Sequence, residues 1–245
     1  PGTLYYEKCK AIVSDVAEAE NVVQVRQHQV QGQLRIGSSV AFGRRVVIPL
    51  ALDFMQHNPQ VEVDLSFEDR YTDLVANGID VALRLGKLAD STLGARTLGV
   101  NPWVLVASPH YLKKHGTPRR PSDLKEHATL IYSSVQGNDV WRLRNASGEA
   151  ASVPVTGRLR SNNLSALLAA ARAHMGIAAL PCYVAHESLK AGRVVEVLKA
   201  CRLPEQEIHA VYPSPRLVPQ KVQAFIAFLQ GRFGKDWWEQ LPRGG

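Results

Sequence analysis

Residues 33–67 read QLRIGSSVAFGRRVVIPLALDFMQHNPQVEVDLSF. The run Leu34–Gly37 predicts a short strand, and the alternation of apolar and polar residues over Val61–Phe67 predicts a half-buried one. The segment between them, Gly43–His57, reads as a helix, and Pro49 within it predicts a kink or a later helix start, because proline removes a backbone donor. This stretch therefore predicts a strand–helix–strand unit.

Short apolar runs and helical segments keep alternating up to residue 233, which is typical of a mostly parallel sheet covered by helices. One series ends near residue 98 and a second begins at Trp103, so we expect two α/β lobes. The further strands are expected at Ile79–Leu83, Trp103–Ala107, Leu130–Tyr132, Trp141–Asn145, Val153–Thr156, Ile177–Leu180, Val194–Leu198 and Ile208–Tyr212, and the further helices at Tyr71–Asn77, Pro109–Lys114, Asn163–Met175 and Val218–Phe233.

An N-terminal helix is predicted ahead of these lobes. Apolar residues recur at alternating spacings of four and three, at Tyr5, Cys9, Ile12, Val16, Ala19 and Val23. This heptad pattern is typical of a helix that packs along another helix, so residues 1–31 are expected to form a linker and dimerisation helix. The alternative is a surface helix docked on its own domain. Because the sequence begins with Pro1 rather than Met, we expect a fragment of a longer protein.

Composition excludes several classes of protein. The 245 residues are 45% hydrophobic and 21% charged, enough to bury a substantial core. No stretch approaches the ~20 apolar residues of a membrane span, and no secretion signal opens the chain, so a cytoplasmic protein is expected. The cysteines, Cys9, Cys182 and Cys201, are far apart and outside any CxxC, which predicts reduced thiols and neither disulfides nor a metal site.

The positive charge is concentrated in one part of the chain. The formal net charge is +7, and residues 99–195 alone carry twelve basic and five acidic side chains. The basic residues are scattered as singles and pairs without interleaved aromatics, which argues against direct nucleic-acid binding. A basic lobe also suits an anionic small ligand, because a cleft lined by one sign of charge concentrates the other.

The common catalytic motifs are absent from the sequence or incomplete, which argues against an enzyme. The sequence has no GxSxG, GxGxxG, P-loop, HExxH or paired CxxC. Ser122–Lys125 fits SxxK and 161–163 loosely matches SDN, but no KTG follows, so a serine acyltransferase is not favoured. We therefore expect a non-enzymatic protein without a cofactor.

Five segments carry a family resemblance when taken together, in order and at their spacing. They are QLRIG at 33–37, the run from Pro59 to Leu65, DLVANGIDVALRLG at 73–86, VLVASPHYLKKHGTPRRPSDLKEH at 104–127 and GIAALP at 176–181. The chain resembles the effector-binding domain of LysR-type transcriptional regulators from residue 32 to 233, and residues 3–31 resemble the linker helix before it.

The resemblance implies an α/β fold of two Rossmann-like subdomains with a cleft, similar to type 2 periplasmic binding proteins. Subdomain I would comprise 32–98 and 197–234, subdomain II 99–196, and a C-terminal tail 235–245, in which Trp237 and Trp238 are candidates for docking. The chain would cross between lobes near 98–104 and 194–198.

The resemblance also implies partners: a small-molecule effector, a homodimer or homotetramer, and RNA polymerase as a candidate. The basic lobe favours a small organic anion as that effector. Promoter DNA would be bound only through an N-terminal winged helix-turn-helix that is absent here. The alternative is a periplasmic-type solute-binding protein of a transport system. The heptad-patterned helix favours the regulator, because a solute receptor does not need it.

Candidate ligand residues follow from where strands end. In open α/β sheets, ligands bind beyond the carboxyl ends of the strands, near helix N-termini that favour anions. Hydroxyls, amides and arginines at such positions are expected to hold the effector, with Phe42 and Trp141 as apolar walls; the polar candidates are Ser38, Ser39, Arg70, Arg84, Ser133, Ser134, Ser161, Asn162 and Asn163. Helix capping is the alternative for the serines and asparagines, and pairing with Asp69 or Asp73 the alternative for Arg70.

Overall fold

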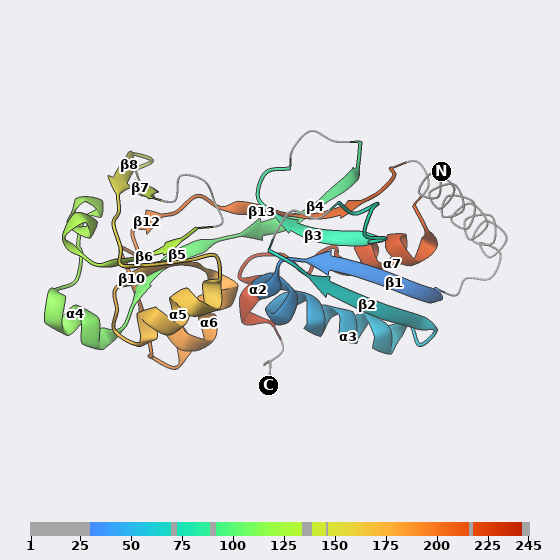
Figure 1. Cartoon of the computed structure of the whole chain (residues 1–245), viewed down its shortest axis with the longest axis horizontal. Coiled ribbons are helices and arrows are strands. Elements are labelled where there is room, and N and C mark those ends of the chain that lie inside the picture. The colour runs from blue at the N-terminus through green and yellow to red at the C-terminus, as the bar shows by residue number, and fades with distance from the viewer. Residues whose placement is uncertain are drawn as a thin grey trace, which may run out of the picture.

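The computed structural model describes residues 30–69, 73–88, 92–133, 139–145, 147–215 and 218–241. These residues form two α/β lobes that lie side by side and are joined by two chain crossings (Figure 1). The two-lobed α/β architecture expected from the sequence is confirmed. The predicted helix over residues 3–25 lies outside the described residues. Among the described residues, no helix is both long and apolar enough to cross a membrane.

The first lobe is built on a five-stranded sheet of order β2-β1-β3-β13-β4. β1 is parallel to both of its neighbours, whereas β13 is antiparallel to β3 and β4. The strands are β1 (Gly32–Ser38), β2 (Val61–Phe67), β3 (Val81–Leu85), β4 (Gly94–Asn101) and β13 (Gln206–Tyr212), and the helices are α2 (Val40–Phe42), the π-helical segment η1 (Gly43–Val47), α3 (Ile48–His57), α7 (Gln220–Leu229) and the short η3 (Trp237–Glu239).

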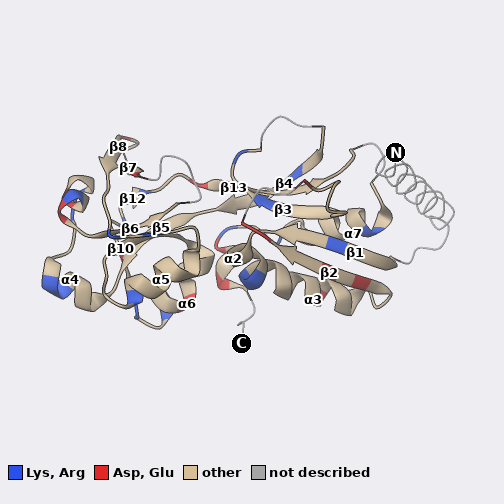
Figure 2. Cartoon of the chain, viewed as in Figure 1, with Lys and Arg blue, Asp and Glu red and all other residues tan. Residues whose placement is uncertain are grey.

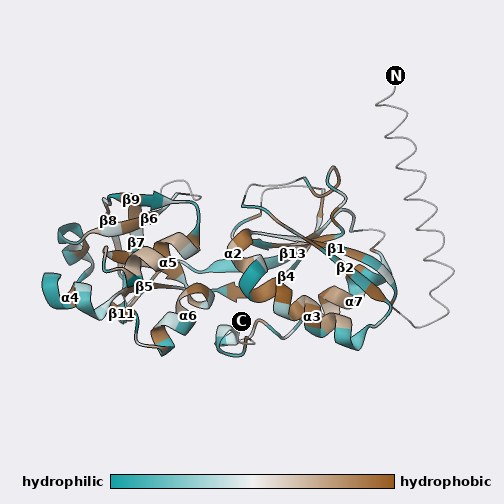
Figure 3. Ribbon diagram, turned by 60° about the horizontal axis from the view of Figure 1, so that its bottom comes forward, coloured by the Kyte–Doolittle hydropathy of each residue, from teal (hydrophilic) through white to brown (hydrophobic). Residues whose placement is uncertain are grey.

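Helices α3 and α7 pack together over this sheet, where Leu34 and Ile36 of β1 are fully buried. Phe54 of α3 meets Phe225 of α7 edge to face at 5.1 Å. Figure 3 shows hydrophobic residues along α3, whereas the outlying α4 (Pro109–His115) is largely hydrophilic. Burial of this apolar surface is the main stabilising contribution to the lobe.

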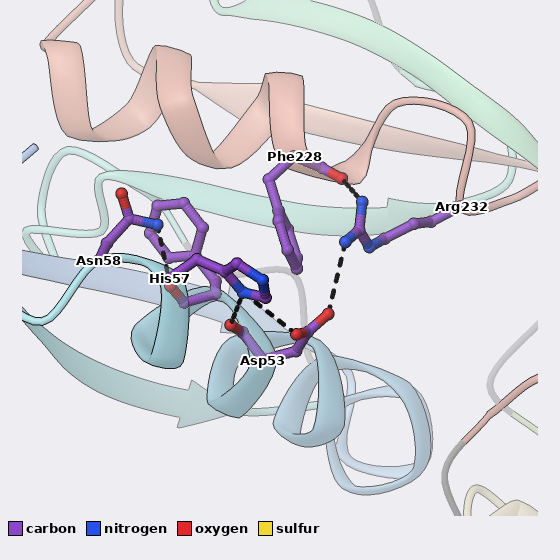
Figure 4. A network of polar contacts seen from close by, with 6 residues as sticks. Asp53, His57, Asn58, Phe228 and Arg232 are labelled. Atoms are coloured by element: carbon purple, nitrogen blue, oxygen red, sulfur yellow. Dashed lines mark hydrogen bonds and ion pairs between the residues drawn. The ribbon is translucent and has the colours of Figure 1, made fainter.

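A polar network fastens the outer ends of the same two helices (Figure 4). Arg232, just beyond α7, lies 3.4 Å from a carboxylate oxygen of Asp53 in α3 and stacks on the Phe228 ring at 3.6 Å. The His57 ring also contacts Asp53, with Nδ1 2.8 Å from its backbone carbonyl oxygen. Because these groups are exposed, we expect them to fix the orientation of the helices more than to stabilise the fold.

Pro49 explains why the first helix begins irregularly. Its ring crowds the carbonyl of the residue four positions earlier and it has no N–H to donate. The preceding turn is π-helical, and the Ile48 N–H bonds to the Gly43 carbonyl five residues back. Gly43 is also required by packing, since a Cβ there would lie 2.4 Å from the Phe67 ring. Of the two outcomes expected at Pro49, a kink or a later helix start, the structure shows the later start, because regular α-helix begins at Ile48.

The second lobe contains a five-stranded sheet of order β11-β5-β10-β6-β9 and a three-stranded sheet of order β12-β7-β8. Its strands are β5 (Trp103–Ala107), β6 (Thr129–Tyr132), β7 (Val140–Asn145), β8 (Ala150–Pro154), β9 (Leu159–Ser161), β10 (Ile177–Pro181), β11 (Val195–Val197) and β12 (Cys201–Arg202), and its helices are α4, η2 (Pro121–Glu126), α5 (Leu164–Arg172) and α6 (Cys182–Lys190). Trp141 is buried in the core of this lobe with Leu143 and Val153, away from the position of a cleft wall.

The chain passes between the lobes twice. β4 leads into β5 across Pro102, and β12 leads into β13 across residues 203–205. The return crossing lies later than the expected 194–198, because β11 pairs with β5 and β12 pairs with β7. Residues 197–202 therefore belong to the second lobe, whereas subdomain I was expected to resume at residue 197.

Several further elements differ from expectation, and β9 and β12 are among them, since neither strand was predicted. β4 and α6 were not predicted, and residues 74–78 form a turn where the end of a helix over Tyr71–Asn77 was expected, with Tyr71 itself outside the described residues. The tail is docked at Trp237, which is 3% exposed and donates from Nε1 to the Val100 carbonyl at 2.9 Å.

Candidate functional site

A cavity of about 570 Å³ lies between the two lobes. Loops at the ends of β1, β2 and β3 form one side, and the beginnings of α5 and α6 form the other. The crossings contribute Trp103 and Gln206, and the C-terminal segment contributes Trp238 and Leu241. A residue next to each crossing therefore lines this cavity.

The first lobe contributes most of the cationic side chains. Arg44, Arg45, Arg84 and Lys87 line the cavity, together with the carboxylates Glu68 and Asp69. Arg45 is half-buried, and this burial, followed by the neighbouring charge of Arg44, lowers the pKa of its guanidinium. Within the described residues Arg45 forms no ion pair. The cavity therefore contains a partly desolvated guanidinium that forms no ion pair with the described carboxylates.

The N-terminus of α2 already holds a carboxylate. Asp69 Oδ1 accepts a hydrogen bond from the Val40 N–H at 3.0 Å, so a side chain of this protein takes a position where we expected a ligand anion. Ser39 is the N-cap residue, but its side chain makes no capping hydrogen bond. The Ser39 hydroxyl, which lines the cavity, is thus not committed to the helix.

The second lobe faces the cavity with the N-terminus of α5. Asn163 Oδ1 accepts hydrogen bonds from the Ser165 and Ala166 N–H groups at 2.9 and 3.2 Å, which is ordinary helix capping. Asn162 lies beside it in the lining. Tyr132 and Trp103 supply aromatic surface, with ring centroids 6.0 Å apart.

Tyr183 of α6 carries an unsatisfied polar atom at this site. The residue is 4% exposed, and its hydroxyl has no hydrogen-bond partner among the described residues. Burial raises the pKa of the phenol, the proximity of Tyr132 raises it further, and the charge of Arg45 opposes the rise. A buried hydroxyl without a partner is costly, and a ligand acceptor would satisfy it.

The structure separates the predicted site residues into three groups. Ser39, Arg84, Asn162 and Asn163 line the cavity. Arg70 and Ser134 lie outside the described residues. Ser38, Phe42, Ser133 and Ser161 are described but do not line the cavity.

Each member of the last group has another role. Ser38 donates from its hydroxyl to the Leu83 carbonyl at 3.3 Å, and Phe42 is fully buried against Tyr183 at 5.2 Å. The Ser133 N–H donates to the Ser161 carbonyl at 2.9 Å, and Ser161 Oγ accepts from the Asn163 N–H at 3.0 Å.

Sequence reasoning missed Arg44, Arg45, Tyr183, Trp103 and Gln206 as cavity residues. The Arg44–Arg45 pair follows the first strand and opens the helix. Because ligands in open α/β sheets bind beyond the carboxyl ends of the strands, this position could have identified the pair. The other three depend on the arrangement of the two lobes. Among the described residues, no group of three His, Cys, Asp or Glu side chains is arranged to hold a metal ion.

Residues 27–234 match the family model described as LysR substrate binding domain. The chain is 33% identical over 240 residues to the HTH-type transcriptional regulator DmlR of Escherichia coli K12, covering 96% of this chain and 76% of that protein. It is 30% identical over 246 residues to the transcriptional activator AaeR of the same organism, covering 99% and 79%.

Solved structures agree with these sequence relatives. The regulatory domain of CrgA from Neisseria meningitidis, a LysR-type transcriptional regulator, has a TM-score of 0.74 and 27% identity, covering 83% of this chain and all of that one. The full-length Vibrio cholerae virulence activator AphB has a TM-score of 0.72 and 28% identity, covering 93% and 78%. The similarity supports a transcription regulator and not a transport receptor.

Proposed function

Because the chain belongs to the LysR substrate-binding domain family and is the effector-binding domain of a LysR-type transcriptional regulator, we propose that the cavity between its lobes binds a small organic anion. Regulators of this type bind small effectors and DNA and act as oligomers. The effector would change the arrangement of the lobes and thereby control transcription.

One observation carries the choice of an anion: Arg45 is a half-buried guanidinium in the cavity wall without an ion pair in the described chain. A partly buried charge is costly unless a partner compensates it, and a carboxylate can bind an arginine through two parallel hydrogen bonds. Arg44 adds a second charge beside it.

Tyr183 adds a hydrogen-bond donor near the same position. Its hydroxyl is close enough to Arg45 for each to affect the other's ionisation, and it has no described partner. Charge-assisted hydrogen bonds each contribute ~1.5–3 kcal/mol, so two or three support roughly micromolar binding after the costs of association. A small carboxylate held by Arg45, Tyr183 and Ser39 is the ligand class that these groups favour.

We also propose that the chain acts by binding and not by catalysis, in the cytoplasm, as a homodimer or homotetramer. The similar proteins named above are transcriptional regulators, and the sequence contains no complete set of catalytic motifs, since the SxxK match at Ser122–Lys125 has no accompanying KTG. RNA polymerase is the partner through which such an effector domain would act on transcription.

A thermal-shift screen of small carboxylates, each paired with its neutral amide, tests the ligand class. The carboxylates are expected to raise the Tm with concentration, because a ligand that binds only the folded state stabilises it. Arg45→Gln should weaken the best carboxylate roughly tenfold or more by calorimetry, which corresponds to about 1.4 kcal/mol. Arg172→Gln at the exposed end of α5 is the matched control, since it removes the same charge outside the cavity. Equal binding of the amides, or unchanged affinity in Arg45→Gln, would contradict the proposal.

A further inference from the structure

The second lobe carries a basic face that the effector cavity does not use. It lies on the three-stranded sheet β12-β7-β8, at the end of the molecule far from α3 and α7 (Figure 1). Trp141 and Leu143 of β7 point into the core of the lobe, so the alternate residues Arg142 and Arg144 lie on the opposite face. Both of these arginines are exposed.

Two arginines stand directly opposite each other on this face. Arg202 of β12 pairs in register with Arg144 of β7. Like charges at opposed positions of neighbouring strands destabilise a sheet. Neither arginine forms an ion pair among the described residues. The sheet therefore keeps an unfavourable pair of charges that an external anion would relieve.

A second cavity, of about 520 Å³, opens at this pair. Its described lining is Arg144, Asn145, Gly148, Lys199, Ala200 and Arg202, of which three are cationic and none is acidic. The guanidinium of Arg144 donates to the Gly148 carbonyl at 3.0 Å, which holds it at the cavity. Glu149, which follows Gly148 in the sequence, accepts from Asn145 Nδ2 at 3.1 Å and forms no ion pair with either arginine.

The wider charge distribution favours a polyanion. Residues 99–202 carry fourteen Lys and Arg but only six Asp and Glu; Figure 2 shows these charges spread over the lobe. Arg142 continues the row of cations beyond the cavity along β7, where a single small anion would not reach. The scatter of basic residues along the sequence argued against direct nucleic-acid binding, but the fold gathers four of them. We call these four the basic face: Arg142, Arg144, Lys199 and Arg202.

We propose that the basic face binds the phosphodiester backbone of duplex DNA without reading its sequence. Arginine suits phosphate because its planar guanidinium donates two parallel hydrogen bonds. The double helix presents one negative charge per about 1.7 Å of its axis, so it supplies the repeated charges that a row of cations requires. This contact is distinct from operator recognition and from the effector cavity. It would let the regulatory domain contact the DNA to which the whole regulator is bound.

Salt dependence provides the test. The 245-residue chain is titrated into a fluorescently labelled, random-sequence duplex at several NaCl concentrations, and binding is followed by anisotropy. Four phosphate contacts predict a slope of log K against log[NaCl] of about −3.6, and the double variant Lys199→Gln, Arg202→Gln should reduce its magnitude by about 1.8. Neither of these side chains forms a described hydrogen bond or ion pair, and loss of the Arg202 charge relieves its repulsion with Arg144, so the Tm should not fall.

The double variant Lys113→Gln, Lys114→Gln on α4 is the matched control, because it removes two exposed lysines of the same lobe. It should leave the slope nearly unchanged. Equal losses in both double variants would show a diffuse charge effect and overturn the site. Absence of DNA binding by the unsubstituted chain would also overturn the proposal. If DNA did not bind but inorganic phosphate raised the Tm, the second cavity would be assigned to a free anion instead.

Discussion

The indole Nε1 of Trp103 donates a hydrogen bond to Oε1 of Gln206 at 2.9 Å, which ties one lobe crossing to the other. The same oxygen accepts a second hydrogen bond from Nδ2 of Asn101 at 3.1 Å. Asn101 is fully buried, and Trp103 and Gln206 both line the cavity. A single side-chain oxygen thus connects the two crossings at the wall where a ligand would bind.

Gln206→Ala is expected to destabilise the protein by about 2 kcal/mol, because it leaves the buried Asn101 amide and the Trp103 indole without their acceptor. Urea unfolding followed by circular dichroism measures this. Gln223→Ala is the control: its side chain donates to the Val218 carbonyl on the exposed side of α7, and its removal should cost less than ~0.5 kcal/mol. Equal effects of the two substitutions would mean that the crossing oxygen is not important for stability.

Ser38 and Ser39 should respond differently to replacement by alanine. Ser38→Ala removes a buried hydrogen bond to Leu83 and should cost about 1 kcal/mol of stability without changing ligand affinity. Ser39→Ala should leave stability nearly unchanged, because the hydroxyl does not cap α2, and should weaken carboxylate binding by roughly tenfold. Unfolding and calorimetry measure the two quantities. A stability loss in Ser39→Ala with unaltered affinity would show a structural role for that hydroxyl.

The adjacent tryptophans of the C-terminal segment should separate stability from binding. Trp237 packs against Phe42, Phe233 and Tyr183, so Trp237→Ala is expected to cost about 3–5 kcal/mol in unfolding experiments. Trp238 is half-buried and lines the cavity, so Trp238→Ala should chiefly lower ligand affinity. If truncating Trp238 lowered stability as much as truncating Trp237, the division of roles would be wrong.

Cys182 should resist thiol reagents while the protein is folded. Burial, followed by the charge of Glu196, raises its pKa from the ordinary 9.0 to about 12. In a Cys9→Ser background at pH 8, a disulfide reagent should label the partly exposed Cys201 but reach Cys182 only after denaturation.

The raised pKa of Cys182 also predicts a loss of stability in alkali. Below pH 9 the thiol is protonated in both the folded and the unfolded protein. Between pH 9 and 12 the unfolded chain loses this proton more readily than the folded protein does. The free energy of unfolding therefore falls as the pH rises. Urea unfolding from pH 8 to 10.5 should show this decrease, and the Cys182→Ala variant should show less of it.

The strands and helices with strong patterns were predictable, whereas elements that depend on distant pairing were not. β5 begins and ends at the predicted residues, because its apolar run is buried throughout its second half. β4 reads GARTLGVN and has little apolar pattern; it forms a strand because β13, over a hundred residues later, pairs along its length. The Tyr212 ring covers Gly94 so closely that a Cβ there would lie 2.1 Å away.

The site shows the same division. Ser39, Asn162 and Asn163 were expected near the ligand because they follow strand ends, and they line the cavity. Arg45 was not predicted, although it follows the first strand and lies where the helix opens, in the π-helical turn before Pro49. Tyr183 was missed because the helix that carries it starts directly after β10, without a break in the pattern.

The position of β13 between β3 and β4 sets an order of events during synthesis on the ribosome. The sheet of the first lobe cannot be completed until β13, residues 206–212, has left the ribosome. All strands of the second lobe, in contrast, end by Arg202. Since a ribosome adds about 5–20 residues per second and domains fold as they emerge, the second lobe can assemble first, while β3 and β4 each expose an unpaired edge. Nascent chains stalled before residue 206 are therefore the stage at which aggregation and chaperone binding should be greatest.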